Sequence, residues 1–288
     1  MIISASRRTD VPAFFAREFM DGVRAGFLNV PHPRNPRLVS RVELSPSGVE
    51  AIVFWTRDAR PLLPRLRELD DRGYAYYFQY TLLDGPTVLD PEGPRGEEAV
   101  AAFRALSERL GPDRVVWRYD PIVFSNRTGA AFHRRRFERL ASALAGATKR
   151  VMISLVDFYP SAAARFRELE RRGVRVRPPS PEDLAGLMPA LVETAAGREL
   201  EILSCAEEIN LEPWGVRPGK CIDDGLLSRL LGRPLRLRKD PRQRKACGCV
   251  ESRDIGVYGT CPRGCVYCYA AGRRRPAAST AGETDRLR

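Results

Sequence analysis

The sequence predicts an α/β fold whose parallel sheet forms a partial or closed (βα)6-type barrel. Six apolar runs rich in β-branched or aromatic residues recur along the chain, and most are followed by a stretch with helical spacing. Strands that alternate with helices pair in parallel through right-handed crossovers, and the helices cover the sheet. The 288 residues of the chain suit an α/β barrel. A doubly wound open sheet is the alternative, but no G-x-G-x-x-G motif follows a predicted strand.

The predicted strands are short apolar runs bounded by polar or turn-forming residues. They cover residues 2–6, 51–56, 74–83, 114–119, 150–156 and 200–205. A proline-rich excursion from Val30 to Pro36 interrupts the alternation of strands and helices. The stretch after it, 38–44, alternates like a short exposed strand or hairpin arm.

The predicted helices lie between these strands, at residues 12–24, 61–69, 97–110, 132–144, 161–172 and 182–196. In the first of them, Phe15, Phe19 and Val23 recur at helical spacing. A glycine is expected to end two others, Gly111 after the third helix and Gly173 after the fifth.

The predicted domain organisation follows the change in composition along the chain. We expect residues 1–210 to form the barrel core. Residues 211–272 form a basic, cysteine-rich segment that is expected to bind a cluster and pack on the same domain. The polar stretch 273–288 is expected to be disordered.

The composition is that of a globular protein with a sizeable core, at 43% hydrophobic and 29% charged residues. No apolar run is long enough to cross a bilayer. The seven cysteines, three of them closely spaced, favour metal binding or catalysis in a reducing compartment over a secreted disulfide scaffold. We therefore expect a cytoplasmic protein that does not bind membranes.

The net charge of +12 is concentrated toward the end of the chain. From residue 217 to 288 there are 17 Lys and Arg against 7 Asp and Glu, a balance of +10. One interpretation is a general preference for arginine on a solvated face. The other is a field that attracts an anionic substrate or nucleic acid.

A cysteine-rich stretch covers residues 247–270. It reads C-G-C-V-E-S-R-D-I-G-V-Y-G-T-C-P-R-G-C-V-Y-C-Y-A. Within it, Cys261, Cys265 and Cys268 form a C-x3-C-x2-C motif. Three thiolates this close can converge on one soft metal centre, either zinc or an iron–sulfur cluster. Three thiolates on a four-iron cluster leave one iron open to another ligand.

Four further cysteines, Cys205, Cys221, Cys247 and Cys249, can form a second metal site. With four thiolates it would be a second iron–sulfur cluster or a structural zinc site. The alternative for Cys205 and Cys221 is that they are small buried apolar residues.

Polar side chains occur where the predicted strands end, which in an α/β barrel is the functional face. Arg118 and Asp120 flank Tyr119 at the end of one strand and are the catalytic candidates. They would pair with each other or hold polar groups of a substrate. A helix cap explains many such residues equally well. The two histidines, His32 and His133, are expected to be exposed, and no Ser-His-Asp, H-E-x-x-H or P-loop pattern is found.

Several stretches resemble a bacterial family of unknown function whose C-terminal cysteines are similar to radical S-adenosylmethionine (radical SAM) motifs. They are S-A-S-R-R-T-D-V-P-A-F, I-V-F-W-T-R, W-R-Y-D-P-I and the cysteine-rich stretch itself. V-Y-C-Y is also similar to the photoproduct-lyase-like branch of those enzymes.

The resemblance implies that Cys261, Cys265 and Cys268 hold a [4Fe–4S] cluster whose open iron binds S-adenosylmethionine. Reduction by an electron donor would then give a 5′-deoxyadenosyl radical. Tyr267 would shield the cluster or approach the adenine. The cofactor-binding residues implied are Tyr267, Arg7, Trp55 and Thr56.

Radical SAM enzymes carry this cysteine loop after the first barrel strand, whereas here it lies near the other end of the chain. A Gly-Gly-Glu segment of the kind that contacts the methionine part of the cofactor is also lacking. Our hypothesis is a permuted barrel, in which residues 254–259 form a strand beside residues 2–6. Neighbouring parallel strands share one functional face, so the loop would reach its usual place.

The leading functional hypothesis is a radical SAM-type oxidoreductase or lyase acting on an unidentified substrate, which is anionic or a nucleic acid if the basic field is functional. Two alternatives stay open. One is a non-catalytic nucleic-acid-binding protein with structural zinc, and the other is an iron–sulfur electron carrier.

Overall fold

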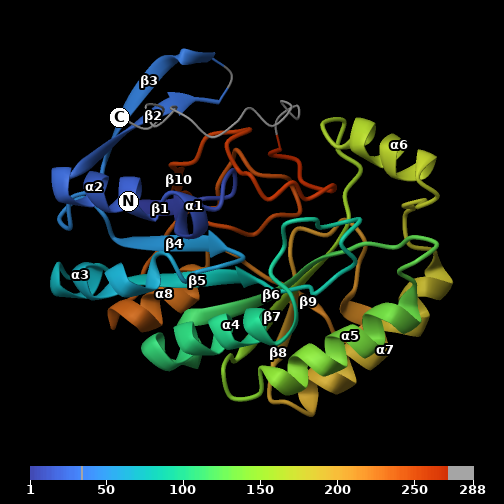
Figure 1. The fold of residues 1–288 in the computed structure, drawn as a ribbon. Coiled ribbons are helices and arrows are strands. Elements are labelled where there is room, and N and C mark those ends of the chain that lie inside the picture. The colour runs from blue at the N-terminus through green and yellow to red at the C-terminus, as the bar shows by residue number, and fades with distance from the viewer. Residues whose placement is uncertain (34, 272–288) are drawn as a thin grey trace.

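The centre of the molecule is a parallel sheet of eight strands (Figure 1). The computed structural model describes residues 1–33 and 35–271. The strand order is β10-β1-β4-β5-β6-β7-β8-β9, and each neighbouring pair is parallel. The strands are β1 (Ile2–Ala5), β4 (Ala51–Thr56), β5 (Tyr76–Thr81), β6 (Val115–Ile122), β7 (Arg150–Leu155), β8 (Glu201–Ser204), β9 (Arg217–Pro218) and β10 (Arg253–Asp254).

This sheet confirms the predicted α/β class, and all six predicted strands are present. From β1 through β8 the strands lie side by side in chain order, without the reversal that defines a doubly wound sheet. Within the described residues the sheet ends at β10 on one side and β9 on the other, so no closed barrel is shown.

Helices cover one face of the sheet (Figure 1). They are α1 (Val11–Phe14), α2 (Ala16–Ala25), α3 (Leu66–Asp71), α4 (Gly96–Leu110), α5 (Ala130–Ala143) and α7 (Pro181–Ala196). The helix α6 (Ala163–Arg171) instead packs through Leu169 in a separate apolar cluster. Side chains alternate along a strand, so Phe54 and Phe78 point to this face and pack with Phe19 of α2 and Phe103 of α4. Burying such large aromatic rings is the main source of stability here.

The other face of the sheet has two parts. Near the strand beginnings, Val53 and Tyr77 pack against Leu226 and Leu227 of α8 (Asp224–Leu231) in a second apolar cluster. Near the strand ends this face is not filled by helices and instead borders a cavity. The segment that begins at residue 211 therefore packs directly on the sheet.

Some predicted boundaries were wrong. The helix expected over 12–24 breaks at Phe15 into α1 and α2, and the one expected over 61–69 is a 3-10 turn (Leu63–Arg65) followed by α3. The proline-rich excursion contains the end of β2 (Phe27–His32) and the start of β3 (Asn35–Glu43), and these two strands pair in a separate antiparallel ribbon. Proline is tolerated there because both strands of a ribbon have an unpaired edge.

The strand β10 joins the two ends of the chain. Ser4 of β1 pairs with Asp254, and the Asp254 carboxylate accepts hydrogen bonds from the Ser6 hydroxyl at 2.7 Å and the Arg7 amide at 2.9 Å. It also accepts from the Ser4 hydroxyl at 3.0 Å and the Gly256 amide at 2.9 Å. Only Arg253 and Asp254 lie in the sheet, fewer than the 254–259 expected, but they lie beside β1 as expected.

Two observations complete the comparison with the predicted organisation. The stretch 273–288, expected to be disordered, lies outside the described residues. Among the helices in the described part of the chain, none has the length and apolar character needed to cross a bilayer.

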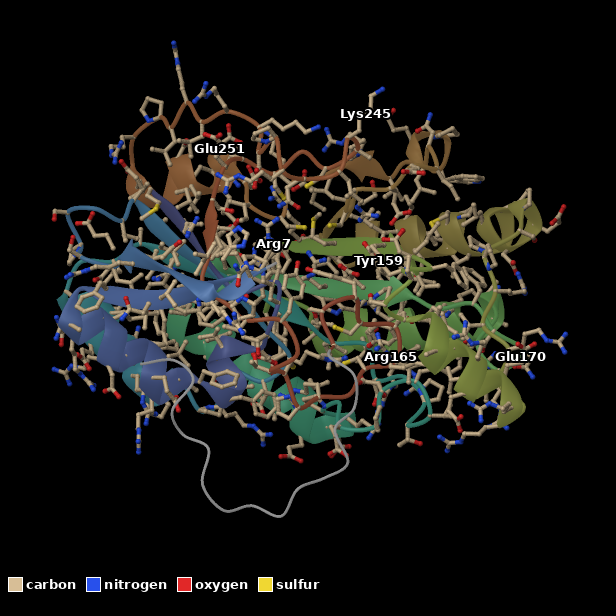
Figure 2. The ribbon with its side chains drawn as sticks, turned by 90° about the horizontal axis from the view of Figure 1, so that it is seen from above. Arg7, Tyr159, Arg165, Glu170, Lys245 and Glu251 are labelled. Atoms are coloured by element: carbon tan, nitrogen blue, oxygen red, sulfur yellow. The ribbon has the colours of Figure 1, made fainter. Side chains whose placement is uncertain are left out.

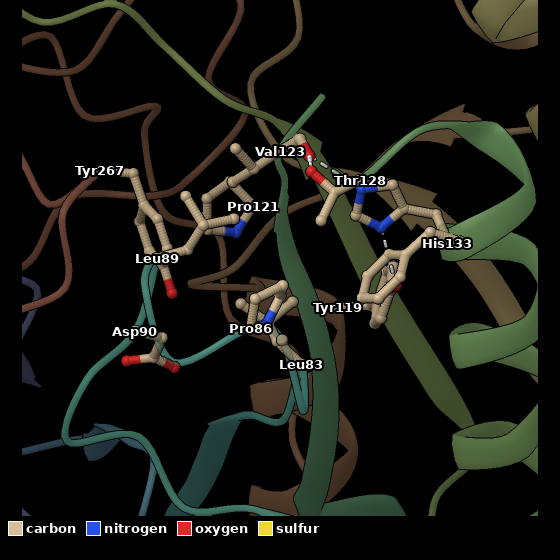
Figure 3. Close-up of a pocket in the computed structure, with 12 residues that line it drawn as sticks. Leu83, Pro86, Leu89, Asp90, Tyr119, Pro121, Val123, Thr128, His133 and Tyr267 are labelled. Atoms are coloured by element: carbon tan, nitrogen blue, oxygen red, sulfur yellow. Dashed lines mark hydrogen bonds between the residues drawn. The ribbon is translucent and has the colours of Figure 1, made fainter. Parts of the chain in front are cut away.

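His133 is buried, which corrects the expectation that it is exposed. Its Nδ1 lies 2.9 Å from the Tyr119 hydroxyl and its Nε2 lies 3.0 Å from the Val123 carbonyl (Figure 3). Burial lowers the pKa of His133 from 6.5 to about 4, so the imidazole is neutral near pH 7. His133 shares the buried face of α5 with Phe137, Leu140 and Ala141, a helical spacing that the sequence shows and that the expectation overlooked.

Replacing Asp254 with Ala is expected to lower the free energy of unfolding by about 3 kcal/mol, because several donors lose a charged acceptor at once. Urea denaturation followed by circular dichroism measures the change. The control is Asp71→Ala on the exposed surface of α3, where the side chain makes one ion pair at 3.8 Å. Equal stability of the two variants would contradict the role of Asp254.

Lowering the pH from 6.5 to 4 is expected to reduce stability through His133. The unfolded chain binds a proton on this histidine near pH 6.5, whereas the folded chain does so only near pH 4. Stability from His133 is therefore present above 6.5 and lost as pH falls through this window, by about 3 kcal/mol in all. The free energies of unfolding of the wild type and of His133→Gln, compared across this pH range, measure the loss. Parallel pH profiles of the two proteins would contradict the role of His133.

Candidate functional site

A cavity of about 680 Å³ lies at the carboxyl ends of the parallel strands. Figure 2 shows the molecule from above, with Arg7, one of the lining residues, near the middle of the view. Every site residue expected from the sequence lines this one cavity: Arg7, Trp55, Thr56, Arg118, Asp120, Cys205, Cys221, Cys247, Cys249, Cys261, Cys265, Tyr267 and Cys268. Residues more than 200 positions apart in the chain thus meet at the face where α/β proteins place their chemistry.

The loop with the C-x3-C-x2-C motif is anchored by Arg57 at the end of β4. Arg57 donates to the Cys265 sulfur at 3.2 Å and to the Tyr267 hydroxyl at 2.9 Å, and it forms an ion pair with Asp90. Burial alone would lower the pKa of Arg57, but Tyr267, Cys265 and Asp90 raise it, so the guanidinium group stays charged. Cys265 in turn donates to Asp90 at 3.4 Å.

Burial favours the protonated form of two loop thiols, those of Cys261 and Cys265. It raises the pKa of Cys265 to about 12 and also raises the pKa of Cys261. A soft metal ion that binds here must displace these protons, so metal uptake is expected to release protons and to strengthen as the pH rises.

Asp10 connects the loop to the sheet. Its carboxylate accepts from the Thr56 hydroxyl at 2.6 Å and from the Arg57 amide at 2.9 Å, and it lies 3.6 Å from the Arg263 guanidinium. It also caps α1 through the Ala13 amide. The Thr56 hydroxyl, expected to contact a cofactor, is therefore already used to hold Asp10.

The other four cysteines form a second group, here called the four-cysteine group: Cys205, Cys221, Cys247 and Cys249. The sulfur atoms of Cys205 and Cys221 are 3.0 Å apart. The pKa of Cys249 is lowered because the thiols of Cys221 and Cys247 donate to it, and the Ile222 amide donates to its sulfur at 3.3 Å. The four cysteines that the sequence groups together thus lie together in the structure.

Arg118 is a buried cation that contacts the four-cysteine group. It donates to the Cys221 sulfur at 2.8 Å and to the Cys205 sulfur at 3.7 Å, and it forms an ion pair with Asp120. Burial opposes its charge, but the two cysteines raise its pKa. Asp120 also accepts from the Ser154 hydroxyl. Arg118 and Asp120 are thus paired with each other at the wall of the cavity, and both residues line it.

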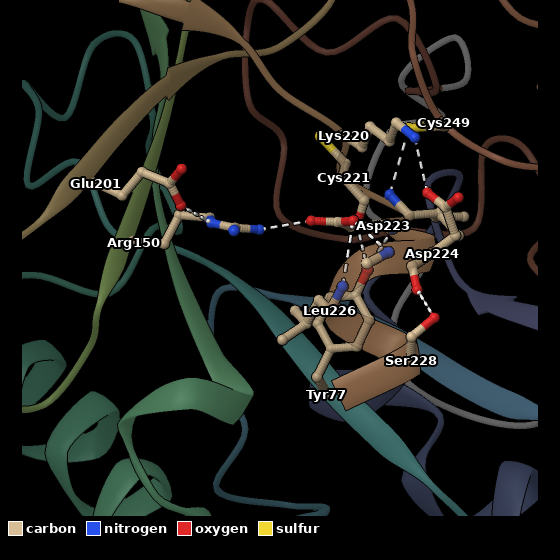
Figure 4. Close-up of polar contacts among 12 residues, drawn as sticks. Tyr77, Arg150, Glu201, Lys220, Cys221, Asp223, Asp224, Leu226, Ser228 and Cys249 are labelled. Atoms are coloured by element: carbon tan, nitrogen blue, oxygen red, sulfur yellow. Dashed lines mark hydrogen bonds and ion pairs between the residues drawn. The ribbon is translucent and has the colours of Figure 1, made fainter. Parts of the chain in front are cut away.

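The chain around Cys221 is fixed by a network of hydrogen bonds (Figure 4). The Tyr77 hydroxyl and the Gln79 amide donate to the Cys221 carbonyl at 2.6 and 2.7 Å. Asp223 caps α8 and pairs with Arg150 at 2.7 Å. These contacts hold the sulfur of Cys221 over the ends of the sheet strands.

Trp55 lines the cavity and packs beside the four-cysteine group, with two guanidinium groups near its ring. The centre of the Arg118 guanidinium is 4.8 Å from the ring centroid and that of Arg7 is 5.7 Å away. Cys249 and Asp254 raise the pKa of Arg7 against the effect of burial. Two cations therefore face the four-cysteine group.

Buried donors without partners also surround the cavity. Within the described part of the chain, the Thr9 hydroxyl, the Trp55 indole nitrogen and the Nε atoms of Arg57 and Arg263 have no hydrogen-bond partner, and all four residues line the cavity. Buried polar groups are normally satisfied, so these four donors are exceptions.

In the described residues no three His, Cys, Asp or Glu side chains are already arranged as a metal site. The thiols of the four-cysteine group instead hydrogen-bond to one another. The chemistry of the donor set still fits a soft metal: the four-cysteine group can supply four thiolates, and the loop can supply three beside an open cavity.

Sequence reasoning missed Arg57 and Asp90 as parts of the site, whereas Asp10 was expected among the polar residues at the strand ends. Arg57 follows directly on a predicted strand end, which was a usable signal. Asp90 lies in a Gly- and Pro-rich loop, where nothing in the sequence indicates that its carboxylate contacts a cysteine 175 positions away.

The fold and site together define an α/β protein with two cysteine groups on one cavity at the carboxyl ends of a parallel sheet. The chain belongs to the family described as Domain of unknown function (DUF1848), whose model matches residues 2–270. No curated protein and no solved structure matched the chain.

Replacing Arg118 with Met is expected to weaken Zn²⁺ binding by the four-cysteine group about 10- to 100-fold, because the thiolates lose a hydrogen-bonded cation. Competition with a chromogenic chelator measures this in a background where Cys261, Cys265 and Cys268 are Ser. The control is Arg134→Met on exposed α5. An affinity unchanged by Arg118→Met would show that this cation does not support the group.

Proposed function

We propose that this protein is a radical SAM-type iron–sulfur enzyme, with a [4Fe–4S] cluster held by Cys261, Cys265 and Cys268. The observation that carries the proposal is the position of these three thiols on the wall of a large cavity at the functional face of a parallel sheet. A structural metal site is closed by four protein ligands, whereas a catalytic site keeps a position open. Three cysteines beside a cavity fit the second kind.

The arrangement of the strands supports a permuted partial barrel. Strands β1 and β4 to β8 form six parallel strands in chain order, and β10 lies beside β1. The cysteine loop follows β10, so it leaves the sheet next to the first strand of the series. This is the neighbourhood in which radical SAM enzymes carry their cluster loop, reached here from the other end of the chain.

The unpaired donors support a ligand with many acceptors. S-adenosylmethionine carries a carboxylate, ribose hydroxyls and adenine nitrogens, which would suit the unsatisfied donors of Trp55 and Arg57. When bound, the cluster and this cofactor supply a reducing electron and the 5′-deoxyadenosyl radical. Arg7 and Trp55 would bind the cofactor, whereas Thr56 acts on it only through Asp10.

The protein's own residues position the reactants and exclude water. The Tyr267 hydroxyl accepts a hydrogen bond from Arg57, and the ring packs beside Leu89. In this position Tyr267 is proposed to shield Cys265 from solvent. Arg118 and Asp120 present opposite charges to the cavity and are proposed to hold the polar groups of the substrate.

The four-cysteine group is proposed to hold a second iron–sulfur cluster or a structural zinc ion. Zn²⁺ with four thiolates carries a net charge of −2, and so does an oxidised four-iron cluster. Arg7 and Arg118 face the group and would balance that charge. A protein dependent on reduced thiols and on an electron donor fits the cytoplasm, which is part of the proposal.

The proposal is tested by anaerobic reconstitution, counting iron and sulfide per chain and measuring 5′-deoxyadenosine after reduction. The wild type is expected to form it from S-adenosylmethionine, and Cys265→Ala is expected to lose it. Arg134→Met, on the exposed face of α5, is the control and should keep it. Zinc without sulfide in the wild type would instead favour a binding protein, and an iron–sulfur cluster without 5′-deoxyadenosine an electron carrier.

A further inference from the structure

A strongly basic stretch lies beside the cavity. Residues 233–245, here called the basic segment, hold seven Arg and Lys against one acidic residue: Arg233, Arg236, Arg238, Lys239, Arg242, Arg244 and Lys245, against Asp240. All seven cations are exposed, whereas Asp240 is buried. The segment therefore presents almost only positive charge to solvent.

The basic segment leads directly to the site. Arg242 and Arg244 line the cavity, and Cys247 follows two residues after Lys245, which is labelled in Figure 2. Some of its cations are paired, such as Arg244 with Asp157 at 2.6 Å. In the described part of the chain, the side chains of Arg236, Arg242 and Lys245 have no hydrogen bond or ion pair. These three charges are free to bind an anion.

Three tyrosines also line the cavity: Tyr159, Tyr258 and Tyr269. The ring centroid of Tyr269 lies 5.3 Å from that of Tyr159 and 6.5 Å from that of Tyr258. Tyr258 is 44% exposed and Tyr269 is 37% exposed. Arg8 stacks on Tyr258 at 5.1 Å. Exposed aromatic rings among arginines are the stacking platforms of single-strand binding sites.

We propose that the substrate is a single-stranded nucleic acid. Its phosphates bind the basic segment, one base stacks on Tyr258, and the adjoining nucleotide enters the cavity. This assignment rests on the proposed function, which it extends by naming the substrate class. A base paired within a duplex is inaccessible to a buried site, so the reacting nucleotide must be unpaired.

The size and charge of the cavity agree with this substrate. Its volume of about 680 Å³ lies in the range of about 300–1,000 Å³ that small-molecule sites occupy. Eight arginines and five aspartates line it, without lysine or glutamate, so fixed positive charge predominates: Arg7, Arg8, Arg57, Arg118, Arg242, Arg244, Arg253 and Arg263, against Asp10, Asp120, Asp157, Asp240 and Asp254.

The test measures fluorescence anisotropy of labelled 12-nucleotide DNA and RNA single strands, and of the matched duplex, from 50 to 200 mM KCl. Single strands are expected to bind more tightly than the duplex. The triple variant Arg236→Ser, Arg242→Ser, Lys245→Ser is expected to reduce the slope of log affinity against log salt by about 2, since each phosphate contact on a single strand contributes about 0.7. Tyr258→Ala is expected to weaken binding at least about fivefold.

The matched control removes three exposed charges elsewhere, Arg17→Ser, Arg134→Ser, Arg135→Ser on α2 and α5, and should leave the slope unchanged. Preference for DNA or RNA identifies the natural strand and supports the proposal either way. Equal binding of heparin, equal effects of the two triple variants, or no binding of single strands overturns it. Formation of 5′-deoxyadenosine is measured in parallel, so a failure here and a failure of the proposed function are told apart.

Discussion

The carboxylate of Asp254 joins two segments that are about 250 residues apart in the chain. It accepts from the hydroxyls of Ser4 and Ser6 and from the amides of Arg7 and Gly256. Bringing such distant segments together costs chain entropy, which a cluster of charge-assisted hydrogen bonds offsets. Gly256 is required at this contact, because a Cβ there would lie 2.0 Å from the Ser6 hydroxyl oxygen. Without this junction, the cysteine loop and the strand ends would not form one site.

Both cysteine groups are built on the same physical device, a buried guanidinium in contact with sulfur. Arg57 contacts Cys265 on one side of the cavity, and Arg118 contacts Cys221 on the other. Burying an arginine is costly unless it is paired, and here the partners are a carboxylate and one or two thiols in each case. Positive charge held this way stabilises thiolates, and hydrogen bonds to sulfur also tune the potential of an iron–sulfur centre. Stability alone does not require such groups, so they indicate function.

The sequence predicted the strands and the shared face well because both depend on local patterns. Alternation of strands and helices gave the parallel sheet, and polar strand ends such as Arg7 and Arg118 were found because parallel strands end on one side. In the ribbon β2–β3, only the arm over 38–44 was predicted as a strand. The strand Phe27–His32 was missed because it contains proline, which is tolerated there since this strand pairs with one neighbour. The ion pair between Arg57 and Asp90 depends on a tertiary contact that no local pattern records.

The position of β10 has a consequence for biosynthesis. Synthesis runs from the N-terminus, and a domain generally folds as one unit. Strands β1 to β8 are made before Arg253–Asp254, so β10 and the cysteine loop are added last. A prematurely stopped chain would lack the loop thiols. The metal site proposed at Cys261, Cys265 and Cys268 would thus be confined to chains that are translated through the loop.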